Sequence, residues 1–428
     1  MKILIISKEA WRDEQNGGNV LTNMFSHFSD SEFAQIYCNE QDPNNAICRN
    51  YYQMSDRMMV NNILHRTKVG RKVIYNHVPT ATVVTNENYR KMASWIGGDL
   101  KRIVRELVWQ LGKWDESEII FYAKEFNPDV IFAPCYGNHY MQKLTILVHE
   151  KLKVPVISYI SDDFYTNKQF KFSPIFWINH FFLRRRTRTT FKHYSLVYTM
   201  TNEQKEQCER DFGANMKILR KNGQFASQYL KKTVNSPIRL VYAGGIYLDR
   251  WKTLKVLADA IRAINVDGVK MVLDVYTNNL LNDKMQQAIN DGVSSRVHKA
   301  VSMVELMEIY HHSDVALHVE AFDVTNRHIV RMSFSTKIID CMDSGCAVMA
   351  ICDKKQAGGA YLRRNGCAIC INDLSEVAHV LKNILENPQV LIEYQHKAFD
   401  VGRKYHLQEN ITRDLIQDFE SIEKAKKL

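Results

Sequence analysis

A cluster of hydroxyl side chains and one lysine stands at the start of a predicted helix in the second half of the chain. In the stretch VRMSFSTKIIDCMDSGCAVMAI, Ser335, Thr336 and Lys337 open a helical segment, predicted over Ser335–Ser344, that ends at Gly345. Ser335 or Thr336 can cap this helix, and the glycine can terminate it. A helix N-terminus holds phosphate, because its N–H groups are unpaired and its dipole end is positive. Lys337 adds a cation where the dipole alone favours an anion, which indicates a bound diphosphate.

Asp340 follows Lys337 by one helical turn and lies on the same face of the predicted helix. A carboxylate at this position could accept hydrogen bonds from a ribose diol. The alternative is a surface ion pair between Lys337 and Asp340 beside ordinary capping serines, since exposed pairs of this spacing are common. This segment alone leaves both interpretations open.

A second candidate site follows the strand in VYAGGIYLDRWKTLKVLADAI. Gly244 and Gly245 would let the backbone approach a ligand closely. In the loop that follows, Arg250 could fork onto a diphosphate and Lys252 could act as a point charge. The alternative is a solvated basic loop, because arginine and lysine are mostly exposed in any protein.

Parallel α/β sheets are the elements that would position these residues. Continuous apolar strands are predicted at 2–7, 129–135, 155–161, 196–200, 238–244, 269–277, 315–320 and 346–352. Helices are predicted between them, at 144–152, 202–213, 253–264, 304–313 and 377–387. This alternation is typical of parallel sheets covered on both faces, where ligands bind beyond the carboxyl ends of the strands.

The length of 428 residues exceeds one ordinary core, so two domains are expected. The weakly patterned segment 221–237 is the predicted linker, and 40–115 is interpreted as part of the first domain with an excursion. We therefore predict an N-terminal domain over 1–222, with the C-terminal helix 405–428 packing back on it, and a C-terminal domain over 223–404.

The composition indicates what kind of partner the protein binds and in which cellular compartment it works. The formal net charge of +10 fits an acidic partner, whether nucleic acid, anionic membrane or phosphorylated substrate. Nine scattered cysteines do not form a disulfide framework, and Cys367 and Cys370 are interpreted as buried strand thiols rather than zinc ligands. The N-terminus is too soon polar for a signal peptide, and no apolar run reaches the ~20 residues of a membrane span. A reduced, cytoplasmic protein is expected.

The second half resembles the donor-binding domain of the GT-B glycosyltransferases, specifically the retaining nucleotide-sugar enzymes of family 4 and their bacterial polysaccharide-synthesis branch. The segments LVYAGGIYLDR, SMVELMEIYHHSDVALHVE and SFSTKIIDCMDSGCAVMAI carry the resemblance in the second half. VYTMTNEQKEQCERDFGANMKILRKNGQ is similar to the crossover segment, and NGGN follows the first strand where the family places a Gly-rich loop. The resemblance implies two doubly wound Rossmann-like domains, an acceptor domain followed by a donor domain, facing across a cleft.

The resemblance also implies a reaction, namely transfer of a sugar from a nucleotide-diphosphate donor with retention at the anomeric carbon. It implies no cofactor and no catalytic metal. Arg250, Lys337 and the amides of Ser335 and Thr336 would stabilise the leaving phosphate, and Asp340 would hold the ribose. In the catalytic set Glu320 would contact sugar hydroxyls and Asp162, with Asp163, would orient the acceptor or an oxocarbenium-like centre. The donor-binding set adds four glycines: Gly17, Gly18, Gly244 and Gly245.

Three positions depart from the family pattern. The first of its two glutamates would fall at Met332, so Glu320 is the candidate to replace it from before an insertion over Asp323–Arg331. Where the family has a basic residue after the first glycine, this sequence has Gly245. Where the family has a histidine in the N-terminal domain, this sequence has Asp162. Asp162 and Asp163 could alternatively serve only as turn or capping residues.

The acceptor is inferred from Phe170–Lys192, where six Phe or Trp residues precede four arginines, Arg184, Arg185, Arg186 and Arg188. Aromatics beside an arginine cluster suit an anionic membrane surface, which implies a lipid-linked acceptor. The alternatives are an amphipathic core helix with a solvated basic end, and RNA binding, which no accompanying nucleic-acid module supports.

Two other functions remain compatible with this pattern. A non-hydrolysing sugar-nucleotide epimerase would bind the same donor and convert it without an acceptor. A non-catalytic partner subunit would account for Met332 and Asp162.

Overall fold

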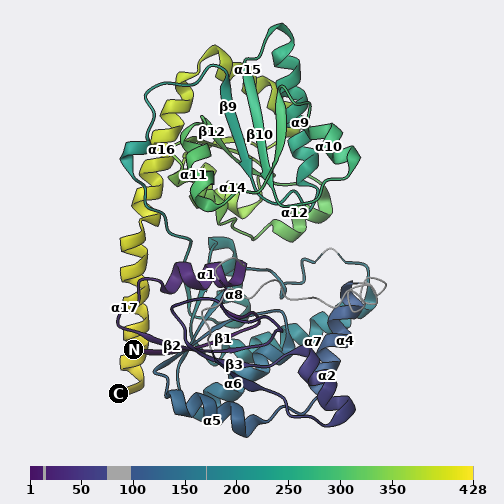
Figure 1. Ribbon diagram of the computed structural model, residues 1–428, viewed down its shortest axis with the longest axis vertical. Helices are drawn as coiled ribbons and strands as arrows, with labels where there is room; N and C mark the ends of the chain where they lie inside the picture. The colour runs from purple at the N-terminus through teal and green to yellow at the C-terminus, as the bar shows by residue number, and fades with distance from the viewer. Residues whose placement is uncertain (13–15, 75–97, 170, 428) are drawn as a thin grey trace. The chain divides into compact units, whose positions relative to one another are not determined.

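The computed structural model describes residues 1–12, 16–74, 98–169 and 171–427 (Figure 1). The chain forms two compact units. The first consists of Met1–Asn167, Lys171–Leu219 and Thr412–Leu428, and the second of Lys168–Phe170 and Arg220–Ile411. The sequence predicted the boundary after residue 222, whereas the second unit begins its main segment at Arg220.

The first unit is built on an eight-stranded sheet in the order β4-β3-β2-β1-β5-β6-β7-β8. All pairs are parallel except β3 with β4. The strands are β1 (Lys2–Ser7), β2 (Glu32–Tyr37), β3 (Asn50–Gln53), β4 (Arg71–Ile74), β5 (Val130–Pro134), β6 (Val156–Ile160), β7 (Tyr194–Thr199) and β8 (Met216–Ile218). Strands β1 and β6 read as continuous apolar runs because helices bury both of their faces.

Seven helices of the described residues lie wholly in this unit, and an eighth, α17, enters it at Thr412. They are α1 (Asn16–Phe25), α2 (Asp56–His65), α4 (Gly98–Leu111), α5 (Glu116–Phe126), α6 (His139–Leu152), α7 (Pro174–Phe191), α8 (Asn202–Phe212) and α17 (Gln408–Lys427). Ser173 and Thr201 cap α7 and α8 through their hydroxyl groups. Along α17, Asp418 accepts a hydrogen bond from the Tyr198 hydroxyl at 2.7 Å, and Phe419 is fully buried against Phe25.

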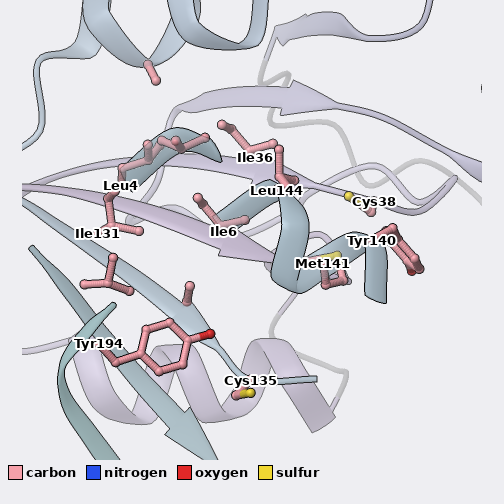
Figure 2. Packing of buried hydrophobic residues seen from close by; sticks show 14 of the residues in the cluster. Leu4, Ile6, Ile36, Cys38, Ile131, Cys135, Tyr140, Met141, Leu144 and Tyr194 are labelled. Atoms are coloured by element: carbon pink, nitrogen blue, oxygen red, sulfur yellow. The ribbon is translucent and has the colours of Figure 1, made fainter. Parts of the chain in front are cut away.

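The core of the first unit lies where helix α6 covers the sheet. Figure 2 shows side chains from β1, β2, β5 and β7 meeting those of α6, with Leu4, Ile36 and Leu144 among them. All are buried, so apolar burial here supplies much of the stability of this unit.

The second unit has a six-stranded parallel sheet in the order β11-β10-β9-β12-β13-β14. Its strands are β9 (Ile238–Ala243), β10 (Met271–Thr277), β11 (Ser295–Lys299), β12 (Val315–Val319), β13 (Ala347–Ile351) and β14 (Ile369–Ile371). Numbered within the unit, this order is 3-2-1-4-5-6, the arrangement of a doubly wound nucleotide-binding sheet.

Helices flank this sheet. They are α9 (Arg250–Ile264), α10 (Asp283–Ile289), α11 (Met303–His311), α12 (Val324–Val330), α13 (Lys337–Asp343), α14 (Ala357–Arg364), α15 (Val377–Glu386) and α16 (Gln389–His406), with short 3-10 turns at Ser227–Tyr229, Asn265–Asp267 and Leu374–Glu376. Helix α9 packs with α10 and α15 (Figure 1), and α13 packs with α16. The predicted α/β class with two doubly wound units is confirmed.

All nine cysteines are free thiols. Cys370 lies half-buried in β14, in keeping with its interpretation as a strand thiol, whereas Cys367 is buried but precedes that strand. Among the described residues, no group of His, Cys, Asp or Glu side chains could hold a metal ion. In the same part of the chain, no helix has both the length and the apolar composition to cross a membrane.

Candidate functional site

The candidate site lies at the switch point of the second sheet. Strands β9 and β12 are neighbours, but the chain leaves β9 toward β10 and leaves β12 toward β13, in opposite directions along the sheet. The carboxyl ends of two such strands border a crevice, because their connecting helices diverge. Gly244 directly follows β9 and Glu320 directly follows β12.

Lys337 is the first residue of α13, in the connection from β12 to β13, and its side chain reaches Gly244. A Cβ added at Gly244 would lie 1.6 Å from the Lys337 Nζ atom. Gly244 also has a φ of +156°, which a residue with a side chain rarely adopts. The glycine is therefore required here by the close approach of the lysine.

The Lys337 ammonium is half-buried and stands 5.6 Å from the centroid of the Tyr242 ring. It forms no hydrogen bond or ion pair with another described residue. Burial lowers the pKa of Lys337, and the positive charge of Arg250 lowers it further. The charges of Glu320 and Asp340 raise this pKa in part, but no described carboxylate forms an ion pair with Lys337, so the ammonium would gain from a bound anion.

Arg250 and Glu320 form a buried, two-pronged ion pair beside this lysine. Arg250 Nε donates to Glu320 Oε2 at 2.8 Å and Nη2 to Oε1 at 3.0 Å, with the side chains 11% and 5% exposed. Burial opposes the guanidinium charge, but the hydrogen bonds and charge of Glu320 outweigh it and raise the pKa of Arg250.

The positions of both residues correct the sequence analysis. Arg250 begins helix α9 rather than standing in a loop. Its guanidinium, which was predicted to bind a diphosphate, donates two hydrogen bonds to the Glu320 carboxylate instead. Each oxygen of Glu320 accepts one hydrogen bond from Arg250 in turn, so its predicted contact with sugar hydroxyls would have to use the remaining lone pairs. Such pairing between strand ends depends on sheet order and leaves no local signal in the sequence. Lys252 is exposed and pairs with Asp249.

Two predictions about the start of α13 need correction. The helix begins at Lys337 rather than Ser335, and Thr336, its N-cap residue, makes no side-chain capping bond. The carbonyls of Ser335 and Thr336 instead accept hydrogen bonds from the amides of Ile338 and Ile339. The amides of Ser335 and Thr336 donate to no other described residue. Two N–H groups and one ammonium of this loop thus have no hydrogen-bond partner among the described residues.

Asp340 pairs with Lys221 and not with Lys337, so the surface pair considered in the sequence analysis is wrong. Both partners are half-buried. Gly345, which follows the helix, has a φ of +72°, and this agrees with its predicted role as the terminating glycine.

His318 and Tyr242 belong to this region and were missed from the sequence. His318 is buried on β12, and its Nε2 atom has no hydrogen-bond partner. Burial lowers the pKa of His318, which favours the neutral form of the ring. The Tyr242 hydroxyl donates to the carbonyl of Gly245 at 2.6 Å, fixing the Gly-Gly turn. Period-two alternation along β9 and β12 could have placed both side chains on the sheet faces.

The residues predicted in the first unit lie on separate elements. Gly17 and Gly18 fall in helix α1, so the expected Gly-rich loop is wrong at these positions. A glycine pair at a helix start resembles a loop in sequence because both tolerate glycine. Asp162 follows β6 and is exposed. Asp163 accepts from the Thr166 amide at 3.0 Å and from its hydroxyl at 2.6 Å, as in the turn role that was the alternative for this pair.

Replacing Gly244 with alanine is expected to displace the Lys337 ammonium, because the new methyl group and Nζ cannot both fit. Nucleotide affinity should fall roughly tenfold or more, by the loss of one charge-assisted contact. Calorimetric titration with UDP measures this. Gly268→Ala is the matched control, since Gly268 also has positive φ but open space around it. Equal nucleotide affinity in the two variants would refute the steric coupling.

The fold identifies a class: the chain has the GT-B fold, with structural matches over the whole chain. Anabaena HepE, solved in complex with UDP, matches with a TM-score of 0.63 at 12% identity, covering 98% of this chain and 100% of that one. Sucrose-phosphate synthase from Thermosynechococcus elongatus matches with a TM-score of 0.62 at 12% identity, covering 99% of both chains. The E. coli protein solved with UDP-2-fluoro glucose gives 0.58 at 10% identity, with 98% and 99% covered.

No protein-family model and no curated sequence matches this chain. HepE was also solved with UDP-glucose, and at such low identity the likeness to these structures establishes the fold.

Proposed function

We propose that the protein is a retaining glycosyltransferase that moves a sugar from a nucleotide-diphosphate sugar to a lipid-linked or saccharide acceptor in cell-surface polysaccharide synthesis. One observation carries the proposal. The half-buried, unpaired ammonium of Lys337 stands at the switch point, against a glycine that leaves it room. UDP is the first candidate nucleotide, because HepE was solved with UDP and with UDP-glucose.

The residues around Lys337 suit the chemistry of a leaving diphosphate. Lys337 and the free amides of Ser335 and Thr336 would bind its oxygens and stabilise the charge that develops as the sugar departs. The Arg250–Glu320 pair would hold one wall of the crevice, with the Arg250 charge close to Lys337. Asp162 remains the proposed residue that orients the acceptor or the oxocarbenium-like centre.

A thermal-shift series tests nucleotide binding. UDP, GDP and ADP should be compared with UMP and CMP, which lack the second phosphate. At one hundred times Kd a diphosphate should stabilise the second unit by about 2.7 kcal/mol, while the monophosphates stabilise it far less. Equal shifts for UDP and UMP, or none for any nucleotide, would refute a diphosphate site.

Asp340→Asn is expected to raise the KM for the donor roughly tenfold, because the ribose hydroxyls would lose a charged acceptor. The free energy of unfolding should change by about 1 kcal/mol or less. Lys221→Ala is the control, since it removes the same ion pair but keeps the carboxylate. If both variants change the donor KM equally, Asp340 acts through the pair and not on ribose.

Peripheral membrane association is part of the proposal and rests on helix α7. Five large apolar side chains of this region are exposed rather than in the core: Phe172, Ile175, Ile178, Phe181 and Phe182. The opposite face of the helix buries Phe176, Leu183 and Phe191. Phe170 lies outside the described residues. The predicted arginine cluster needs one correction, because Arg184 pairs internally with Asp211 at 2.8 Å.

The protein is expected to co-sediment with anionic vesicles at low salt and to be released at high salt. Each basic residue near such a surface contributes about 1 kcal/mol, so replacing Arg185, Arg186 and Arg188 with glutamine should abolish binding. Arg184 stays unchanged because its pair with Asp211 is internal. UDP affinity serves as the control and should be unaffected. Wild-type protein that ignores anionic vesicles at low salt would contradict this part of the proposal.

A further inference from the structure

A groove runs between helices α4 and α7 in the first unit. These helices lie side by side (Figure 1) and line an open groove of about 820 Å³. Its size falls within the range of small-molecule sites. The described lining residues include Ile103 and Leu107 of α4, and Ile175, Ile178 and Phe182 of α7.

The groove changes character along α7. Its apolar residues come first, and Arg185, Arg186 and Thr189 follow toward the C-terminal end of the helix. At the usual rise per residue, Ile175 and Arg185 are about 15 Å apart along the helix axis. One end of the groove therefore suits hydrocarbon and the other suits an anion.

The two arginines have no anionic partner among the described residues. Neither Arg185 nor Arg186 forms a side-chain hydrogen bond or ion pair with another described residue. Glu106 is the carboxylate among the described lining residues, and its oxygens already accept hydrogen bonds from other residues. It accepts from the amide of His139 and from Asn138 Nδ2, both at 3.1 Å, at the start of α6. The basic end thus complements a ligand with negative charge.

We infer that this groove binds the hydrocarbon chain of a lipid phosphate, with the phosphate held by Arg185 and Arg186. The inference rests on the proposed function, since it specifies the acceptor as a phosphate ester of a long-chain alcohol. Its apolar lining and unpaired arginines match the two ends of such a molecule. The hydrocarbon chain of the lipid would leave the bilayer and enter the protein. This differs from docking of the protein on a membrane surface.

Calorimetric titration with dodecyl phosphate below its micelle concentration tests the inference on the full chain. Wild-type protein should bind it at least tenfold more tightly than dodecyl maltoside, which has the same chain without charge, and should bind inorganic phosphate undetectably. Ile178→Glu and Leu107→Glu should each weaken binding at least tenfold, because they place a carboxylate in the apolar end. The double variant Arg185→Gln, Arg186→Gln should weaken it by a similar factor.

The same helices supply matched controls. Phe181 is 62% exposed, as Ile178 is, and Leu111 is 68% exposed, but neither lines the groove. Phe181→Glu and Leu111→Glu should bind dodecyl phosphate like wild type. Equal losses in control and groove variants, or full binding by Ile178→Glu, would overturn the inference.

Two further readouts separate the possible failures. UDP titration of each variant reports the proposed function independently, since Lys337 belongs to the second unit. Absence of UDP binding with intact groove binding would contradict the glycosyltransferase and leave the lipid site standing. Wild-type protein that sediments with phosphatidylglycerol vesicles but does not bind dodecyl phosphate would overturn the groove and favour surface docking.

Discussion

Lys337→Ala is expected to lose most nucleotide binding. A charge-assisted contact to a diphosphate contributes about 1.5–3 kcal/mol, so UDP affinity should fall roughly 10–150-fold. The loss in kcat should add to this, about 10²–10³, if the ammonium also stabilises the charge on the departing phosphate. Calorimetry measures the first effect, and single-turnover transfer measures the second.

The matched control is Lys252→Ala. Lys252 lies in the same region, at the start of α9, but is exposed and already paired with Asp249. It should change UDP affinity by less than twofold. Unchanged affinity in a folded Lys337→Ala protein, or an equal loss in both variants, would remove Lys337 from the site.

Glu320→Ala is expected to have the largest effect on stability. The substitution leaves the Arg250 guanidinium, 11% exposed, without its carboxylate. Removing one partner of a buried ion pair costs about 3–5 kcal/mol, because the remaining charge stays desolvated and unpaired. Urea denaturation of the second unit measures the change in its free energy of unfolding.

Two variants isolate the cause. Asp249→Ala breaks the exposed pair with Lys252 and should cost less than about 1 kcal/mol. Replacing both partners, as Arg250→Met with Glu320→Leu, should recover much of the lost stability because no buried charge remains. A double variant as unstable as Glu320→Ala would show that packing, and not the unpaired charge, dominates.

The sequence predicted those parts of the fold that depend on local patterns. Strands β9 and β12 and helix α15 follow from apolar runs and helical periodicity. The edge strand β11 was missed, and β14 was anticipated only through the interpretation of Cys367 and Cys370 as strand thiols. Strand β11 is largely polar and β14 has only 3 residues, so neither stands out as a long apolar run.

At the site, the sequence indicated which residues gather but not which of them pair. Lys337 and Gly244 were both selected, and the structure brings them into contact. The bond between Arg250 and Glu320 spans 70 positions of the chain and exists because β9 and β12 are neighbours. Spacing along the chain carries no information of this kind.

The arginines of α7 illustrate the same limit. Composition marked Arg184 and Arg185 as equivalent members of one basic cluster. A helix turns about 100° per residue, so adjacent residues face different surroundings. Arg184 therefore meets Asp211 and the Tyr165 carbonyl, while Arg185 lines the groove.

The most direct test of the proposed function follows a panel of sugar nucleotides by proton NMR in the presence of the protein alone. We predict that one α-linked UDP-sugar is slowly hydrolysed to UDP, and that the sugar first appears as the α anomer because the enzyme retains configuration. Lys337→Ala should suppress this release. Conversion of the donor into a different intact sugar nucleotide would instead identify an epimerase. A panel in which no sugar nucleotide is bound or consumed would contradict the glycosyltransferase.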